Sequence, residues 1–313
     1  MKIISFGDVI YFLYPVIPLR WIFALARLRG KLGGLLRTKR YVTVRNNLAS
    51  VYGEKVSAIQ LDAAAHQFLE NQQLQGLLVM LAPRFSLDEL TKLCPLEGLE
   101  HLDRAVALKK GVVLLGSHLN SASQFLAVAL LRKRGYDACV LVTIPGDVWE
   151  RTAFRKFLDG KWGYNSLKEL IGAFHCQFNI RPFIQRLKEN AIVLQTGDGW
   201  HSTGFVQVEF LQRMLPFTTG VLHVAQLSGA TVVPFFAVGA PPDKLRFVIE
   251  EPFMVEKKED PKQELKKSVA AYARRLECHL SDNMACWQHW EIENTLDTMA
   301  TWPQRPLSER FHI

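Results

Sequence analysis

Residues 111–134 read GVVLLGSHLNSASQFLAVALLRKR, and this stretch decides the fold. Its first six residues are apolar and rich in valine and leucine, which predicts a buried strand that ends at Gly116. Ser121 and Gln124 have the spacing of a capping box, so we expect a helix to begin there and to occupy residues 122–134. A buried strand that leads directly into a helix is typical of an α/β chain.

Four further apolar runs of strand length follow along the chain. Helical patterns lie between them at residues 179–189 and 220–228, and a late amphipathic helix is expected over residues 257–282. Continuous apolar strands that alternate with helices predict a central, mostly parallel sheet covered by helices on both faces. The four runs occupy residues 138–143, 191–196, 230–238 and 245–250.

The positive charge of the chain is concentrated near its N-terminus. The 313 residues carry 38 Lys+Arg and 30 Asp+Glu, but residues 1–45 hold nine basic residues and one acid, which leaves 29 of each sign in the remainder. A nucleic-acid-binding protein usually spreads its basic face over the folded body, so we expect no nucleic acid among the partners. With 49% hydrophobic residues and 22% charged residues, the composition also argues against disorder.

Residues 9–28, VIYFLYPVIPLRWIFALARL, combine apolar and basic side chains. Two prolines and Arg20 interrupt the apolar run, which argues against a regular membrane-spanning helix. We expect residues 1–40 to form a membrane-associated helical arm on an anionic membrane surface, and residues 41–313 to form a single α/β domain. The alternative is a buried N-terminal helix followed by a solvated basic tail.

Two polar residues follow predicted strands. His118 comes two residues after the strand at 111–116, and Asp198 follows another strand in the stretch VLQTGDGW at 193–200. Open α/β folds bind ligands at the carboxyl edge of the sheet, where helix amides favour developing negative charge. A histidine at this position can be a general base, and it can equally be a hydrogen-bonded loop residue.

A third stretch, residues 205–229, reads FVQVEFLQRMLPFTTGVLHVAQLSG. Arg213, with Thr219 and Gly220 at the start of the next helix, suits a phosphate or phosphopantetheine group. A surface ion pair between Arg213 and Glu209, four positions earlier, explains the arginine equally well.

The five cysteines are scattered, which suits reduced thiols in the cytosol better than a disulfide framework. Cys278, Cys286 and His289 lie close together in sequence, but their spacing fits no zinc-ligand template. We therefore expect no metal site.

The order of several blocks over residues 41–290 resembles the lysophospholipid acyltransferase superfamily, and within it the lipid A biosynthesis (late) acyltransferase branch. The resemblance implies transfer of a fatty acyl group from an acyl carrier protein or coenzyme A thioester to a lipid or glycolipid hydroxyl. It places the reaction at the cytoplasmic face of the inner membrane and requires no cofactor besides the donor substrate. The blocks are RNNLASVYGE, LEGLEHLDRAVALKKG, GVVLLGSHL, VLQTGDG, FLQRMLPFTTGVLHVAQLSGATVVPF and YARRLECHLSDNMACWQHW.

The signature of that family is H-x-x-x-x-D/E, in which the histidine removes the acceptor proton and the acid orients the histidine, with no acyl-enzyme. The histidine maps to His118, but Ser123 occupies the position of the acid. A serine hydroxyl cannot balance an imidazolium, and in the serine-protease triad loss of the orienting charge costs about 10⁴ in turnover. Three explanations remain: Asp198 supplies the carboxylate, the acceptor is a stronger nucleophile such as an amine, or the chain binds acyl groups without transferring them.

The resemblance also gives Arg213, Thr219 and Gly220 the donor-binding or phosphate-binding role. The apolar segments 205–211 and 125–131 could line an acyl groove, although such segments are more often plain core.

A hydrolase is the competing class of enzyme. Ser117, Ser121 or Ser123 beside His118 and Asp198 could be read as a serine triad, but the chain has no G-x-S-x-G elbow to present the nucleophile. Hydrolysis of a thioester by water would need only His118.

Overall fold

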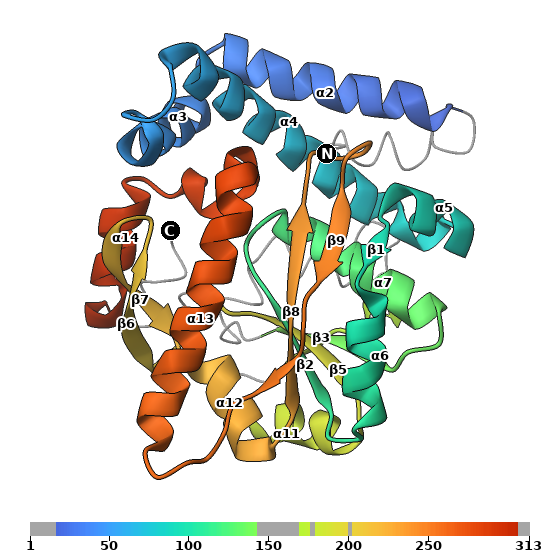
Figure 1. Cartoon of the computed structure of the whole chain (residues 1–313). Helices are drawn as coiled ribbons and strands as arrows, with labels where there is room; N and C mark the ends of the chain where they lie inside the picture. The colour runs from blue at the N-terminus through green and yellow to red at the C-terminus, as the bar shows by residue number, and fades with distance from the viewer. Residues whose placement is uncertain (1–16, 143–168, 176–178, 200–201, 306–313) are drawn as a thin grey trace, which may run out of the picture.

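The central sheet of the computed structural model lies between two layers of helices (Figure 1). The structure describes residues 17–142, 169–175, 179–199 and 202–305. The first part of the expected arm, residues 1–16, and Thr143 at the end of one expected strand lie outside these ranges.

The sheet has eight strands in the order β1-β9-β8-β2-β5-β3-β4, with β10 paired to β8. Every pairing is parallel except those of β8 with β9 and with β10. The expected mostly parallel sheet is therefore confirmed, and β2, β3, β5, β8 and β9 fall on the five apolar runs. The strands are β1 (Leu96–Glu97), β2 (Val112–Gly116), β3 (Ala138–Val142), β4 (Phe174–His175), β5 (Ile192–Thr196), β8 (Thr231–Val238), β9 (Arg246–Ile249) and β10 (Phe253–Met254).

Helices cover both faces of the sheet because its strands alternate between two hydrophobic clusters. Val113 and Leu115 of β2 belong to one cluster, with α11, α12 and α13, whereas Val112 and Leu114 belong to the other, with α6 and α7. The helices are α2 (Leu19–Leu35), α3 (Lys39–Tyr52), α4 (Ala58–Leu81), α5 (Leu87–Leu93), α6 (Leu99–Ala107), α7 (Gln124–Lys133), α11 (Arg181–Lys188), α12 (Gly220–Ser228), α13 (Pro261–Asp282) and α14 (Thr295–Thr301), with short 3₁₀ turns η1 (Ala82–Arg84), η2 (Ser121–Ser123), η3 (Met284–Cys286), η4 (Gln288–Glu291) and η5 (Trp302–Gln304).

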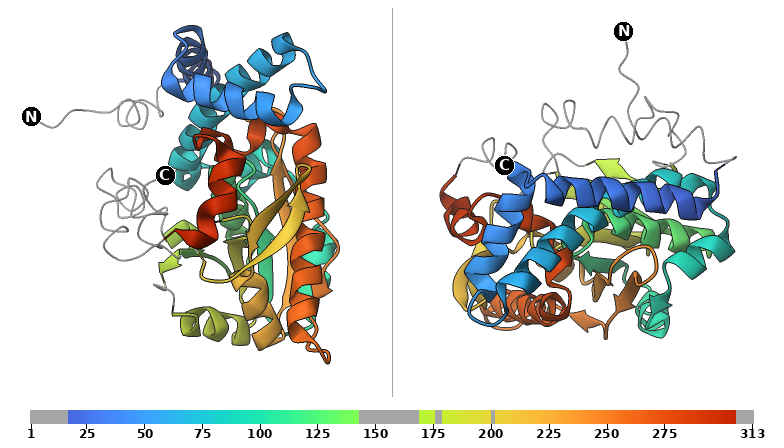
Figure 2. Two further views of the ribbon diagram at one scale, coloured as in Figure 1. Left: turned by 90° about the vertical axis from the view of Figure 1, so that its left-hand side faces the viewer. Right: turned by 90° about the horizontal axis from the view of Figure 1, so that it is seen from above.

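A separate hairpin, β6 (Phe205–Phe210) and β7 (Arg213–Thr218), packs against α13 and α14 (Figure 2). Leu211 and Gln212 form its turn, and both have positive φ, 51° and 62°, as a two-residue type I′ turn requires. No hairpin was predicted from the sequence, which indicated only the helix that begins at Gly220. The usual Asn-Gly turn signal is missing here, which explains why the hairpin was overlooked.

The start of α7 differs from the expected capping box. Ser121 lies in η2, and its Oγ bonds the Gln288 side chain, while Gln124 Nε2 donates to the carbonyl oxygens of Ser117 and Leu119. These two side chains therefore tie the loop after β2 to its surroundings instead of capping a helix.

At the N-terminal end, α2 begins directly after Pro18 and packs along α4. Gly30 and Gly34 face α4 so closely that a Cβ on Gly30 would lie 2.6 Å from the Glu70 Cα. Among the described residues, no helix combines the length and the apolar character that crossing a membrane requires. Residues 19–35 of the expected arm thus form a helix with one face fixed to the body.

The close contact predicts opposite effects for two glycines of one helix. Gly30→Ala should lower the free energy of unfolding by about 1–3 kcal/mol, because the added methyl group meets the Glu70 backbone. Gly33→Ala should leave it unchanged or raise it by up to about 1 kcal/mol, because its Cβ would have only an ordinary contact at 3.6 Å and alanine favours helices. Urea unfolding of both variants measures the difference, and equal effects would contradict the packing of α2 on α4.

Candidate active site

His118 and Asp198 meet at the carboxyl edge of the sheet. His118 follows β2 by two residues and Asp198 follows β5 by two, and β2 and β5 are parallel neighbours. His118 Nδ1 lies 2.8 Å from Asp198 Oδ1, and the His118 backbone N–H donates to both carboxylate oxygens at 3.0 and 2.9 Å. The structure thus brings together the histidine and the acid that the sequence offered as a replacement.

This contact fixes the orientation and the tautomer of the imidazole. An ionised carboxylate only accepts hydrogen bonds, so Nδ1 carries the proton that it shares with Asp198. Nε2 is then the ring nitrogen whose lone pair can accept a proton. The His118 side chain is 20% exposed and lines a pocket, whereas the Asp198 side chain is fully buried.

Two side chains from the C-terminal part of the chain complete the surroundings of Asp198. Trp287 Nε1–H donates to Asp198 Oδ2 at 2.9 Å, and His289 Nε2 lies 2.9 Å from the Asp198 carbonyl oxygen. The His289 ring also packs on the His118 ring, with 4.3 Å between centroids. From the sequence, Trp287 had no assigned role, and His289 was considered only for a zinc site that its spacing did not fit.

Burial alone would raise the pKa of Asp198. The charge and hydrogen bond of His118 outweigh this effect, with smaller contributions from His289 and Trp287, and they hold the pKa well below its usual range. The carboxylate therefore stays ionised at neutral pH. Only an ionised carboxylate can balance the positive charge of a protonated His118.

Ser123, at the position of the family acid, is fully buried. Its Oγ has no hydrogen-bond partner within the described part of the chain. Ser117 is buried as well, with its Oγ accepting from the Leu119 N–H, and Ser121 Oγ bonds Gln288. Within the described ranges, none of the three hydroxyls has a hydrogen bond to His118, so the geometry offers little support for a serine nucleophile.

A buried amide network holds the loop that carries His118. Asn120 has φ 41°, in the left-handed region that asparagine tolerates, and its Nδ2 donates to the carbonyl oxygens of Ala237 and Gly239. Its Oδ1 accepts from Gln75 of α4, and its N–H donates to the Cys286 carbonyl oxygen. The loop is thereby fixed to β8, α4 and η3 at once.

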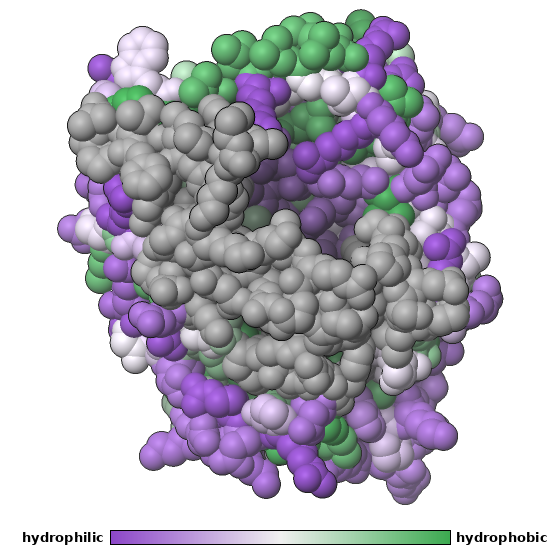
Figure 3. All heavy atoms as spheres, turned by 180° about the vertical axis from the view of Figure 1, so that it is seen from behind, coloured by the Kyte–Doolittle hydropathy of each residue, from purple (hydrophilic) through white to green (hydrophobic). Residues whose placement is uncertain are grey.

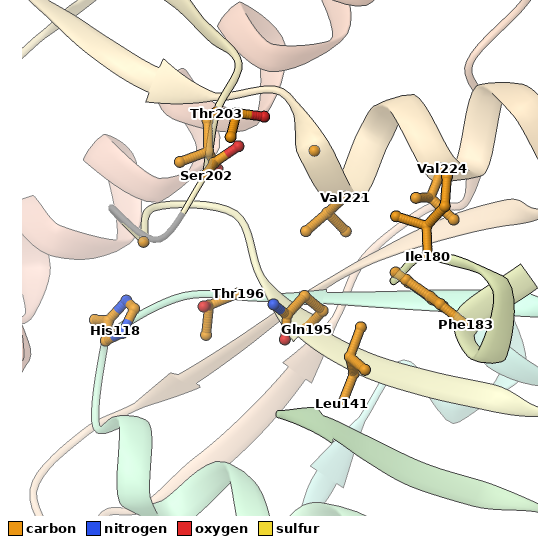
Figure 4. Close-up of a pocket in the computed structure, with 13 residues that line it drawn as sticks. His118, Leu141, Ile180, Phe183, Gln195, Thr196, Ser202, Thr203, Val221 and Val224 are labelled. Atoms are coloured by element: carbon orange, nitrogen blue, oxygen red, sulfur yellow. The ribbon is translucent and has the colours of Figure 1, made fainter. Parts of the chain in front are cut away.

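A pocket of about 210 Å³ opens beside His118. Figure 4 shows His118 at one end and Val224, Ile180 and Phe183 at the other, with Thr196 between them. The pocket is polar near the histidine and apolar further away. Its polar lining includes Gln195, Thr196, Ser202, Thr203 and Thr218, and its apolar lining includes Leu141, Ile180, Phe183, Val221 and Val224.

The expected donor-binding residues are not gathered at this pocket. Gly220, at the start of α12, lines it, and Thr219 precedes that helix. Arg213 is exposed and pairs with Asp297 at 2.7 Å instead of with Glu209. It begins β7, whereas the pocket residue Thr218 ends that strand, and the length of β7 separates the two residues by about 17 Å. Segments 205–211 and 125–131 do not contribute to the lining of this pocket, so they are not its acyl groove.

His118, Asp198 and His289 also form a group whose donor atoms lie within 4.8 Å of one another, close enough to consider a metal ion. The carboxylate oxygens already accept from two N–H groups of His118 and from Trp287. A metal ion would have to displace these hydrogen bonds, so the arrangement suits proton transfer better. Cys286, from the group considered for zinc, instead contacts Asn71 and Gly239.

The hydrogen bond from Trp287 predicts a pH-dependent contribution to stability. The folded-state pKa of Asp198 is lowered, so its stabilisation is present above the unfolded pKa of about 3.9 and is lost as the pH falls through the folded value. Trp287→Phe removes one donor to the carboxylate and should cost about 1.5–3 kcal/mol at pH 7, apart from any cavity effect, with a smaller cost at acidic pH.

Trp290→Phe is the matched control, because Trp290 is equally buried and its Nε1 donates to the neutral Met284 carbonyl oxygen. Its cost should not change with pH. Urea unfolding of both variants in steps from pH 7 down to about pH 1.5 makes the comparison, because the folded protein keeps Asp198 ionised until the pH nears its lowered pKa. An identical pH dependence of the two variants would contradict the role of Trp287.

The N-terminal part of the chain, including His118, is similar to a known family. No curated protein matches the chain. Residues 2–141 match the family described as bacterial lipid A biosynthesis acyltransferase, a segment that contains His118 and Ser123, whereas Asp198 lies beyond it. The resemblance to lipid A biosynthesis acyltransferases that the sequence blocks indicated is thereby confirmed for this part of the chain.

Proposed function

We propose that this protein transfers a fatty acyl group from an acyl thioester to a lipid or glycolipid acceptor, with His118 as general base. The observation that carries the proposal is the contact of His118 with the buried, ionised Asp198 beside a pocket that becomes apolar away from the histidine. The family match supports acyl transfer to a lipid-like acceptor. The donor is an acyl carrier protein or coenzyme A thioester, and no further cofactor takes part.

In the reaction, His118 Nε2 accepts the proton of the acceptor hydroxyl while the hydroxyl oxygen attacks the thioester carbonyl carbon. Asp198 stabilises the imidazolium and keeps Nδ1 directed toward itself. The C–S bond then breaks, and the leaving thiolate takes the proton from His118. No acyl-enzyme is needed.

The pocket suits the donor on two grounds. Its apolar end, with Leu141, Phe183 and Val224, can bury an acyl chain, and each buried methylene contributes about 0.8 kcal/mol. Gly220 and Val221, in the first turn of α12, line the same pocket. The positive end of that helix favours the negative charge that develops on the thioester oxygen.

Asp198 takes the role that the family assigns to the acid at the position of Ser123. This explains how the chain can lack that acid and still perform acyl transfer, without a more nucleophilic acceptor. The membrane location follows from the acceptor: we place the protein at the cytoplasmic face of the inner membrane, held there by its N-terminal arm.

Substitutions at three positions test the assignment. His118→Ala should reduce kcat by about 10³ or more, and Asp198→Asn by about 10²–10⁴, because the imidazole loses its charged partner. Ser123→Ala should stay within about threefold of wild type, since Ser123 Oγ makes no hydrogen bond within the described residues. A large loss in Ser123→Ala together with a small one in Asp198→Asn would overturn the assignment.

The measurement is thiol release from an acyl thioester, with and without a lipid acceptor. Release that requires the acceptor supports transfer, whereas release at the same rate without it supports a thioester hydrolase that uses the same His118. If wild type and His118→Ala behave alike in both conditions, neither enzyme class holds.

A further inference from the structure

The outward face of α2 exposes a row of large apolar side chains. Their exposed fractions range from 44% to 72%, although the opposite face of the same helix is buried against α4. We call this row the α2 stripe; it consists of Trp21, Leu25, Leu28, Leu32 and Leu35.

The spacing of the α2 stripe is that of one helix face. At about 100° per residue, the five side chains fall within an arc of roughly 80°. The centre of that arc lies almost opposite Ala26 and Gly30, which are buried. The buried face also holds Ile22 and Phe23, so α2 is apolar on two opposite faces, of which one packs on the protein and the other is exposed.

Basic residues border the α2 stripe on both sides. Arg29 lies on one side, and Arg20 and Lys31 lie on the other, roughly 80–100° from its centre. All three are exposed, and α2 contains no acidic residue. An apolar row between two cationic edges complements an anionic lipid surface, where acyl chains lie beneath negatively charged head groups.

The α2 stripe lies at the end of the molecule that also carries the catalytic edge of the sheet. Figure 3 shows an apolar band along the upper edge, where α2 runs in Figure 1. The strand β8 runs toward α4 in Figure 1, and β2 and β5 are parallel to it. α4 lies between the two features, since it packs on α2 and bonds Asn120 through Gln75.

We propose that α2 lies flat in the interface of an anionic phospholipid bilayer, with the α2 stripe among the acyl chains and its cationic edges at the head groups. α2 is 17 residues long, about 26 Å, which is shorter than the hydrocarbon core of about 30 Å. Its other face is fixed to α4, so lipid cannot surround it. A second copy of the chain on the same face would bring the cationic edges of two α2 helices together, where they would repel each other.

This inference concerns how the protein sits on the membrane and goes beyond the proposed reaction. Nitroxide labels introduced singly by cysteine substitution along residues 20–35 test it, in the full chain with Cys176 and Cys278 replaced by serine. The vesicles contain equal parts of phosphatidylglycerol and phosphatidylethanolamine. Accessibility to oxygen reports lipid contact, and accessibility to a water-soluble nickel chelate reports water contact.

Oxygen accessibility should peak at the five positions of the α2 stripe, at similar depths, with Arg29 and Lys31 near the head groups. A label at Leu108, which is exposed at the end of α6, should stay accessible to the nickel chelate. Depth that changes steadily along the helix would overturn the flat orientation. If the labels at all positions stay accessible to the nickel chelate when vesicles are present, membrane docking is wrong. If the labels on the α2 stripe are already shielded from the chelate before vesicles are added, membrane docking is also wrong, and a second copy of the chain covers the stripe.

A paired substitution separates docking from catalysis. Leu28→Gln/Leu32→Gln should weaken binding to these vesicles by roughly tenfold or more, because two apolar side chains no longer enter the bilayer. The control Leu108→Gln/Met214→Gln replaces side chains of similar exposure elsewhere and should bind as wild type does. Equal binding of the two variants to the vesicles would contradict the proposal. Thiol release with a soluble acceptor, which needs no membrane, tests the proposed reaction independently.

Discussion

The buried carboxylate of Asp198 is the group on which the candidate site depends. An ionised carboxylate without exposed surface is stable only if donors replace its water. Those donors come from two distant parts of the chain: the backbone N–H and Nδ1–H of His118, in the loop after β2, and the Nε1–H of Trp287, next to η4. Folding around this charge places the His118 imidazole in a defined orientation, so the same interaction organises the structure and prepares the base.

The α/β architecture was predictable from sequence, since five apolar runs became neighbouring strands. The position of His118 at the carboxyl edge followed from the same reasoning. The contact with Asp198 could be offered only as one of three explanations, because 80 residues separate the pair and spacing carries no signal over that range. Trp287 and His289 were missed for the same reason. Arg213 pairs with Asp297 and not with Glu209, because residues four apart face each other in a helix but not in a hairpin.

The helix α4 connects two features that sequence analysis considered separately. On one side it receives α2 through the close contacts of Gly30 and Gly34. On the other, Asn71 reaches the Ala285 carbonyl oxygen and Gln75 reaches Asn120. Buried amides on a helix are costly unless they are hydrogen-bonded, so these contacts fix the position of the loop that carries His118 relative to the helical layer. A lipid acceptor in the bilayer would meet a site held at a constant distance from the α2 surface.

The central claim is that Asp198 holds the His118 ring with its proton on Nδ1, which leaves Nε2 to act as the base. Long-range ¹⁵N–¹H NMR of histidine-labelled protein, at a pH where the ring is neutral, reads the tautomer directly. We predict the Nδ1–H form for His118 in the wild type and its loss or mixing in Asp198→Asn. An Nε2–H tautomer in the wild type, or a ring signal that Asp198→Asn leaves unchanged, would contradict the account.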